Sequence, residues 1–470
     1  MAEELWRWDA VRVARAVRTR AVSSREVVES CLRRLDAVNP ALNAVTVVLG
    51  EEALAAADSA DRAVARGEAL GTLHGVPVTI KENVDVAGQA TPNGIEAYAR
   101  LIAPDDSPQV AAWKAAGAII VGRTNTPAFS LRWDTDNALR GRTRNPWSPA
   151  HTPGGSSGGA AASVATGITP LAHGNDYGGS IRYPAYCCGL VGIRPSLGRV
   201  PAYNPSAAAE RPITGQIMSV QGPLARRVQD VRAGLAAMVR ADPRDPWWVP
   251  APLEGQPPRR PIRVAVTADP AGLGVDPIVA DAVRRAAGWL ADAGYAVEEI
   301  EPPAVDRVAE LWELLVMADT RVMTGPDIEA KGDEGIRRAV GFMLGNRPEL
   351  DLAGYIRGLA ERAGHLRAWS LFSAEHPLVL GPVSTEPPFA VGFDTGEASG
   401  MARTLRAQRL LVAVNLLGLP AVAVPTGQVG DLPLGVQIIG PRFREDLCLD
   451  AAEVIEARAP SLTPIDPRQG

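Results

Sequence analysis

The sequence predicts an α/β fold, in which a β-sheet is flanked by α-helices. Short β-rich runs alternate with helical segments along the chain, and this alternation is typical of a sheet covered by helices. The composition is that of a globular protein, with 46% hydrophobic and 21% charged residues over 470 positions. A chain of this length can bury a large core.

The N-terminal part predicts two helices. Ser23 and Glu26 have the spacing of a capping box, which marks a helix start. Apolar residues then recur at helical spacing, at Val27, Val28, Cys31, Leu32 and Leu35. Glu51 to Arg66 predicts the second helix, and Gly67 is suited to end it because glycine adopts the left-handed conformation.

Strands and helices alternate after this point. Val76 to Ile80 is a short β-rich run that ends at Lys81. The elements that follow are a helix over 107–116, a strand over 118–121, a helix over 160–166, a further strand over 193–200 and a β-α-β unit over 262–300. The helix at 160–166 is entered through a glycine–serine loop.

The chain is expected to form a single domain over residues 1–470. It contains no Ser/Gly linker, charge run or internal repeat that would mark a domain boundary. The proline-rich segment 242–261 is interpreted as a long surface excursion within that domain.

Charge and cysteine content exclude several classes of protein. A net charge of −5 gives no reason to expect nucleic acid or an anionic membrane as a partner. Four scattered cysteines do not make a disulfide framework. The N-terminus lacks a signal-peptide pattern, and the longest apolar stretch, 410–425, is shorter than the ~20 residues of a membrane span. A soluble cytoplasmic protein is therefore expected.

The segment 151–184 carries the main functional signal. It contains two glycine-flanked serines, Ser156 and Ser180. Because glycine lets backbone N–H groups approach a ligand closely, such loops can present a hydroxyl and several amides to one point. A glycine–serine loop is by itself also compatible with a linker or a helix cap.

Lys81 is the third candidate. The chain has only three lysines, Lys81, Lys114 and Lys331, among 48 Lys and Arg residues. Arginine stays protonated, whereas a buried lysine can lose its proton and act as a base. A lysine at the end of an apolar strand therefore indicates a base, although most strand-end lysines are solvated.

Together these positions resemble the amidase signature family. The motifs are PGGSSGG at 153–159 and GNDYGGSIRYPAYCCGLVGIRPS at 174–196, and Lys81 precedes Ser156 by 75 residues, an interval typical of the family. The stretches 122–129, 144–155, 262–300 and 415–443 are also similar to family landmarks. The resemblance has its core motif region at 75–200 and leaves out about 304–390, which is expected to form a variable substrate pocket.

The resemblance implies a mixed, twisted β-sheet with helices on both faces, and a Ser–cis-Ser–Lys triad. In that triad Ser180 is the nucleophile, Ser156 relays its proton and Lys81 is the base. The backbone N–H groups of Tyr177, Gly178, Gly179 and Ser180 are suited to an oxyanion hole. Supporting roles are expected for Ser157, as a hydrogen-bonding neighbour, for Asp176, which orients the loop, and for Arg182, which follows the nucleophile and is expected to pair with it.

Other assignments of these residues remain open. His173 lies near Ser180 in sequence and is either the base or a buried, hydrogen-bonded neighbour. Ser157 is the alternative relay. Cys187 and Cys188 lie in an apolar run and are interpreted as core residues.

The sequence also departs from the family pattern. Asn175 and Tyr177 stand where threonine and isoleucine are common, and Arg123 and Ala128 replace a frequent lysine and glutamate. None of these changes removes a triad member, so they bear on substrate geometry.

The resemblance implies hydrolysis of small amides, with apolar or aryl amides such as anilides expected and carbamates as related substrates. Apolar residues of the variable region are candidates either for the core or for the pocket: Trp312, Leu315, Met317, Met323, Met343, Tyr355, Trp369 and Phe372. The alternatives are the glutamine-hydrolysing component of a tRNA-dependent amidotransferase and a non-catalytic binding protein. No metal or organic cofactor is implied, and the protein is expected to be a monomer or homodimer with a small-molecule substrate.

Overall fold

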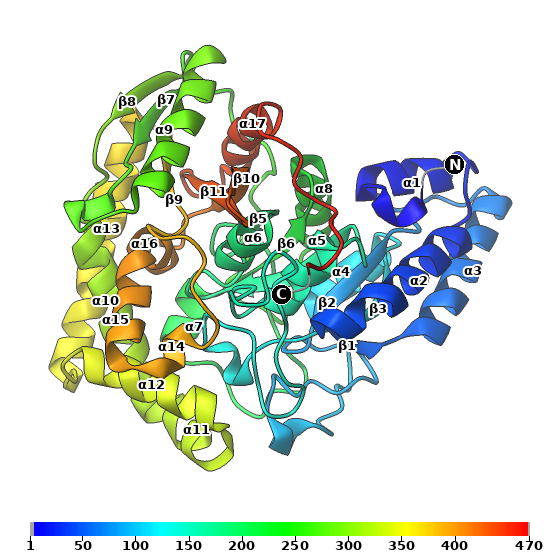
Figure 1. Ribbon diagram of the computed structural model, residues 1–470, viewed down its shortest axis with the longest axis horizontal. Coiled ribbons are helices and arrows are strands. Elements are labelled where there is room, and N and C mark those ends of the chain that lie inside the picture. Colours follow the sequence, from blue (N-terminus) through cyan, green and yellow to red (C-terminus); the bar gives the residue numbers. More distant parts are fainter. Residues whose placement is uncertain (1–3, 469–470) are drawn as a thin grey trace.

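A mixed sheet of eleven strands runs through the molecule in the order β1-β3-β2-β4-β6-β5-β10-β11-β9-β7-β8. The computed structural model describes residues 4–468 (Figure 1). The strands are β1 (Val45–Val48), β2 (Pro77–Lys81), β3 (Ile119–Thr124), β4 (Leu171–Asp176), β5 (Val191–Arg194), β6 (Val220–Ala225), β7 (Arg263–Val266), β8 (Ala296–Glu299), β9 (Leu378–Pro382), β10 (Ala421–Val429) and β11 (Leu432–Ile439). Strand β2 is parallel to both of its neighbours, whereas β4, β6, β5, β10, β11 and β9 are successively antiparallel.

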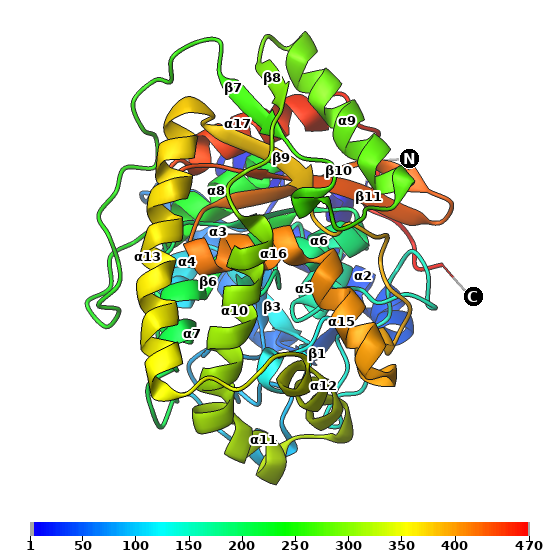
Figure 2. The ribbon, with the colours of Figure 1, turned by 90° about the vertical axis from the view of Figure 1, so that its left-hand side faces the viewer.

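Helices cover both faces of this sheet. The first half of the chain contributes α1 (Ala10–Arg18), α2 (Ser24–Leu42), α3 (Gly50–Arg66), α4 (Pro108–Ala115), α5 (Gly158–Ala165), α6 (Arg182–Cys188), α7 (Ile213–Met218) and α8 (Val228–Met238). The second half contributes α9 (Pro277–Asp292), α10 (Val305–Asp319), α11 (Gly325–Lys331), α12 (Glu334–Asn346), α13 (Leu352–Glu375), α14 (Phe393–Gly396), α15 (Ala398–Ala407), α16 (Arg409–Leu417) and α17 (Glu445–Glu456). Figure 2 shows α10, α13, α15 and α16 gathered on one side of the sheet.

Side chains of successive strand residues alternate between the two faces of the sheet, and this divides the core into two layers. In β10, Val422 and Val424 pack into the layer that contains α1, α4, α8 and α17. Ala421 and Ala423 of the same strand pack into the layer of α5, α6, α10 and α16. Successive side chains of a strand point to opposite faces, so a strand with apolar residues at every position must be covered on both sides. The predicted fold class, a mixed sheet flanked on both faces by helices, is therefore confirmed.

Most elements predicted from the sequence are present. The capping box of Ser23 and Glu26 forms at the start of α2, and Gly67 ends α3 in the left-handed conformation. The parallel β7 and β8 flank α9, as expected for the β-α-β unit. The strand predicted over 193–200 was wrong in its bounds, because β5 ends at Arg194. Pro195 follows it and cannot donate to a strand ladder.

The segment 242–261 lies between α8 and β7 and contains neither helix nor strand, in agreement with the predicted excursion. No helix within residues 4–468 is long and apolar enough to span a bilayer.

Candidate active site

Lys81 lies at the carboxyl end of β2, and every residue of that strand is buried. Lys81 pairs with Thr124 of β3, and its side chain is fully buried. Its Nζ lies 2.7 Å from Ser156 Oγ and 2.7 Å from Asn175 Oδ1. The sheet thus holds the amine directly against one of the two predicted serines.

Burial lowers the pKa of Lys81 well below its ordinary value, and the nearby negative charge of Asp176 opposes this only in part. Removing an ammonium group from water disfavours its charged form. The site therefore favours a neutral amine, which can accept a proton from Ser156. This is the property that a base at this position needs.

Ser156 enters the site through an unusual backbone. The Gly155–Ser156 peptide bond is cis. A Cβ at Gly155 would collide with the backbone of Arg132 and Trp133, so the loop requires glycine there. Ser157 is also buried, but its Oγ lies 3.5 Å from the carbonyl of Asn175 and is not bonded to Lys81. The contact with lysine therefore distinguishes Ser156 from its neighbour.

Ser180 lies in the short loop between β4 and α6. It is 8% exposed, and it lines the same cavity as Ser156 and Tyr177. Gly179 precedes it with φ +96, and a Cβ at that residue would overlap the side chain of Leu411. Only glycine allows this loop to turn while packed so closely against α16.

Asp176 holds the loop in place. Its carboxylate accepts hydrogen bonds from the N–H groups of Gly179 at 2.8 Å and Ile181 at 3.2 Å. Arg182 donates to both of its oxygens, at 3.0 and 3.1 Å, so it pairs with Asp176 rather than with the predicted nucleophile Ser180. Burial alone would raise the pKa of Asp176, but Arg182 and Arg194 hold it well below its usual range. The loop is thus held by a buried carboxylate that stays ionised.

The predicted oxyanion donors are not equivalent. The N–H of Gly179 already donates to Asp176. Within residues 4–468, the N–H groups of Tyr177, Gly178 and Ser180 have no acceptor in the protein. These three remain available to a bound carbonyl oxygen.

His173 occupies a different environment. Its Nε2 lies 3.0 Å from Gln221 Oε1, and its ring packs edge-on against Trp113. Burial is the main cause that lowers its pKa to about 3. No hydrogen bond within the described residues joins it to either serine, so the geometry favours Lys81 as the base.

A cavity of about 720 Å³ opens onto Ser156 and Ser180. Its wall combines apolar and aromatic residues with a few charges, and includes Phe129, Leu131, Tyr203, Pro212 and Trp247. Arg244, also in the wall, is paired with Asp242 and Asp105. Half-apolar walls with convergent polar groups are typical of small-molecule sites.

The walls of this cavity differ from the sequence prediction. The lining residues come from 83–131, 156–180, 202–221 and 244–247, and none of those described comes from 304–390. Trp312, Leu315, Met317, Met343 and Trp369 are buried in the core instead. The apolar periodicity of 304–390 reflects helix packing, while the proline-rich excursion supplies part of the wall.

The structure also shows the contacts of two residues that depart from the family pattern, Asn175 and Arg123. Asn175 accepts from Lys81 and donates to Asn83 Oδ1 at 2.9 Å, so it belongs to the polar network around the lysine. Arg123 is fully buried and donates to the backbone carbonyls of Ala90 and Val84.

The four cysteines are buried free thiols, and burial raises the pKa of Cys188, as expected for core residues. Within residues 4–468, no three His, Cys, Asp or Glu side chains are grouped to hold a metal.

Comparison with known proteins identifies the family. The amidase family model matches residues 26–449, which is most of the chain. This chain belongs to the amidase signature family. Amidases of this family hydrolyse amide C–N bonds, and the protein is an enzyme of that type.

Named proteins and solved structures are similar to this amidase. It is 49% identical to an indoleacetamide hydrolase of Bradyrhizobium diazoefficiens over 97% of this chain and 87% of that protein. It is 31% identical to a glutamyl-tRNA(Gln) amidotransferase subunit of Moorella thermoacetica, over 96% and 97% of the two chains. A 6-aminohexanoate cyclic dimer hydrolase superposes with a TM-score of 0.85 at 27% identity, covering 99% of each chain. A bacterial aryl acylamidase superposes with a TM-score of 0.82 at 26% identity, over 97% and 96% of the two chains.

Proposed function

We propose that this amidase hydrolyses small aryl amides, with a primary amide of an arylacetic acid, such as indole-3-acetamide, as the first candidate substrate. The observation that carries the proposal is the 2.7 Å contact between Lys81 and Ser156, which lines the same cavity as Ser180. The partly aromatic wall suits an aryl group. The 49% identity to an indoleacetamide hydrolase supports the choice of substrate.

The proposed reaction begins with the attack of Ser180 Oγ on the amide carbonyl carbon. The Ser180 proton passes to Ser156 Oγ, and the Ser156 proton passes to the neutral amine of Lys81. The carbonyl oxygen becomes an oxyanion, which is stabilised by backbone N–H groups of the 177–180 loop. The tetrahedral intermediate then expels the amide nitrogen, which takes the proton back through the same relay and leaves as ammonia. Water repeats the sequence on the acyl-enzyme and releases the carboxylic acid.

The activity is expected to depend on pH through Lys81. Only the neutral amine accepts a proton, so kcat/KM rises with pH and levels off above the native pKa of the lysine. Since burial lowers this pKa, the plateau is reached well below the ordinary lysine value of about 10.4. A pH profile of kcat/KM measures this directly. An activity that keeps rising up to the ordinary lysine pKa contradicts a neutral base at neutral pH.

A substrate panel tests the proposed specificity. Indole-3-acetamide, a p-nitroanilide, an aryl carbamate, an aliphatic amide and free glutamine are assayed with wild-type enzyme. Turnover of indole-3-acetamide or the anilide supports an aryl amidase, and turnover of the carbamate extends the activity to urethanes. Hydrolysis of glutamine alone would place the protein with the tRNA-dependent amidotransferases, one of which is 31% identical to it.

A fluorophosphonate probe separates an enzyme from a non-catalytic binding protein. Such probes react with activated serines, so the catalytic proposal expects one labelled residue, Ser180. The Ser180→Ala variant is the control and should not be labelled. An unlabelled wild-type protein contradicts the proposed nucleophile even if its fold is intact.

A further inference from the structure

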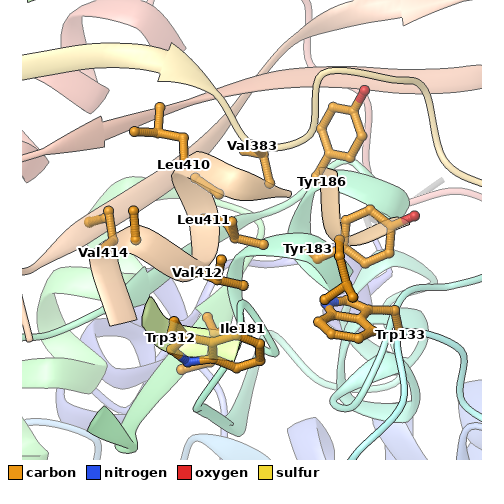
Figure 3. Close-up of a cluster of buried hydrophobic side chains, with 14 of the residues drawn as sticks. Trp133, Ile181, Tyr183, Tyr186, Trp312, Val383, Leu410, Leu411, Val412 and Val414 are labelled. Atoms are coloured by element: carbon orange, nitrogen blue, oxygen red, sulfur yellow. The ribbon is translucent and has the colours of Figure 1, made fainter. Parts of the chain in front are cut away.

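Two tryptophans hold the backbone of the proposed oxyanion loop. Trp312 Nε1 donates to the carbonyl oxygen of Tyr177 at 3.1 Å. Trp133 Nε1 donates to the carbonyl oxygen of Gly178, also at 3.1 Å. The two indoles come from distant parts of the chain and contact each other edge-on, with ring centroids 6.4 Å apart. Figure 3 shows both in the buried cluster, with Leu411 and Val412 of α16 above them.

These hydrogen bonds fix the direction of the opposite N–H groups. In a trans peptide the C=O and the following N–H lie in one plane and point in opposite directions. The bond from Trp133 to the Gly178 carbonyl therefore sets the N–H of Gly179, which donates to Asp176 on the far side of the same plane. That peptide is held from both sides.

The preceding peptide is held from one side only. Trp312 binds the carbonyl of Tyr177, so the N–H of Gly178 points away from the indole. This N–H has no acceptor among the described residues. A Cβ at Gly178 would lie 2.8 Å from Cζ2 of Trp312, so the ring is in direct contact with this backbone. The indole leaves this donor free while fixing its orientation.

Trp312 is itself rigidly placed. It lies on α10, is 3% exposed, and packs edge-on against Tyr177 with ring centroids 6.1 Å apart. The hydroxyl of Tyr177 lies 2.6 Å from Thr214 Oγ1, which donates to the buried carboxylate of Asp319 at the end of the same helix. Because Thr214 uses its single proton on Asp319, it accepts from Tyr177. Side chain and backbone of Tyr177 are thus both tied to α10.

We propose that Trp312 is a positioning residue for the reaction, whose indole N–H aims the N–H of Gly178 at the developing oxyanion. The inference rests on the proposed function, since it assumes attack by Ser180. It also assigns a role to the variable region 304–390, which acts from behind the loop rather than from the cavity wall.

The test is Trp312→Phe, which keeps an aromatic ring and removes the donor. Loss of one oxyanion donor typically costs about 10²–10³ in kcat, so a misaligned donor is expected to lower kcat about tenfold or more with little change in KM. The matched control is Trp369→Phe, because Trp369 is equally buried and donates to the carbonyl of Pro303 at 2.8 Å. The control should keep wild-type kcat at a similar loss of melting temperature.

A second measurement separates alignment from general damage. Ser180 Oγ adds to the carbonyl carbon of an aryl trifluoromethyl ketone while its proton passes through Ser156 to Lys81. The product is a hemiketal oxyanion, which persists because the ketone has no leaving group. In Trp312→Phe its inhibition constant should rise by the same factor as kcat falls, while that of an uncleaved aryl carboxylic acid stays constant. If Trp312→Phe fails to fold, 3-benzothienylalanine at position 312 removes the N–H and keeps both rings.

Results that overturn the positioning role of Trp312 differ from results that overturn the proposed function. Equal kcat values in Trp312→Phe and Trp369→Phe overturn the positioning role while leaving the triad intact. An unchanged inhibition constant for the ketone overturns it too. Activity that survives in Ser180→Ala overturns the proposed nucleophile instead.

Discussion

Replacing Ser180 by alanine is expected to abolish amide hydrolysis, with kcat lower by about 10⁴-fold or more. The methyl group cannot form the acyl-enzyme, so any residual rate comes from binding and oxyanion stabilisation alone. The hydrogen bonds that hold the loop run from the N–H groups of Gly179 and Ile181 to Asp176 and do not involve the Ser180 hydroxyl, so the variant should fold normally. The measurement is kcat and KM on the best substrate of the panel.

Changes at Ser156 and Lys81 are expected to lower kcat about as much as the Ser180 change does. The losses in kcat at Lys81, Ser156 and Ser180 should not add. Ser156 lies 2.7 Å from Lys81, so removing either breaks the same proton path. Residues that act as one unit give a multiple variant hardly slower than the worst single one. Lys81→Met preserves the length of the side chain and is preferred to alanine in this fully buried position.

Ser157→Ala is the matched control for this series. Ser157 is adjacent to Ser156 and equally buried, but its hydroxyl is not bonded to Lys81. It should therefore retain most of the wild-type rate. If Ser157→Ala is inactive and Ser156→Ala is active, the relay passes through Ser157 and the assignment of Ser156 is wrong.

Much of the fold could be predicted from local pattern. The helix at 24–42 is indicated by a capping box and by apolar residues at helical spacing, and the structure contains both. Strand β2 is a short apolar run, and Lys81 stands out only because the chain has so few lysines. These signals lie within a few residues of each other, where sequence reasoning is strongest.

The cavity walls could not be predicted in the same way. The segments 202–212 and 244–247 are irregular, and irregular backbone has no periodicity to indicate which side chains face inward. Trp312 shows the opposite difficulty. Its helical spacing is compatible with either the core or the pocket, and the structure places it in the core. Its bond to the Tyr177 carbonyl spans 135 residues and depends on how α10 packs against the loop. Long-range polar contacts of this kind leave no local trace.

The second large effect is expected at Asp176, whose isosteric change to asparagine should both destabilise the protein and slow the enzyme. The carboxylate is fully buried and accepts from Arg182, from Asn415 and from two backbone N–H groups of the loop between β4 and α6. Removing one partner of a buried ion pair leaves an uncompensated charge and costs about 3–5 kcal/mol. Here Arg182 and Arg194 would both lose their counter-charge.

The contribution of the Asp176 carboxylate to the stability of the fold depends on pH with a definite sign. The native pKa of Asp176 lies below its value in the unfolded chain, which is about 3.9. The carboxylate therefore stabilises the fold fully above that unfolded value, and the contribution is lost only as the pH falls toward the native pKa. At neutral pH the difference between wild type and Asp176→Asn reports the whole effect, measured as a shift in the denaturant midpoint at constant m-value.

Glu445→Gln distinguishes the catalytic part of this effect from the structural part. Glu445 forms a comparably buried ion pair with Arg199 at 2.7 Å and accepts from the N–H of Ser196, but the cavity is not lined by either partner. Both variants should lose stability, and only Asp176→Asn should lower kcat in the folded state, because only Asp176 holds the N–H groups of Gly179 and Ile181. Equal kcat values in the two variants would show that the loop between β4 and α6 keeps its shape without the charge, and that Asp176 serves stability alone.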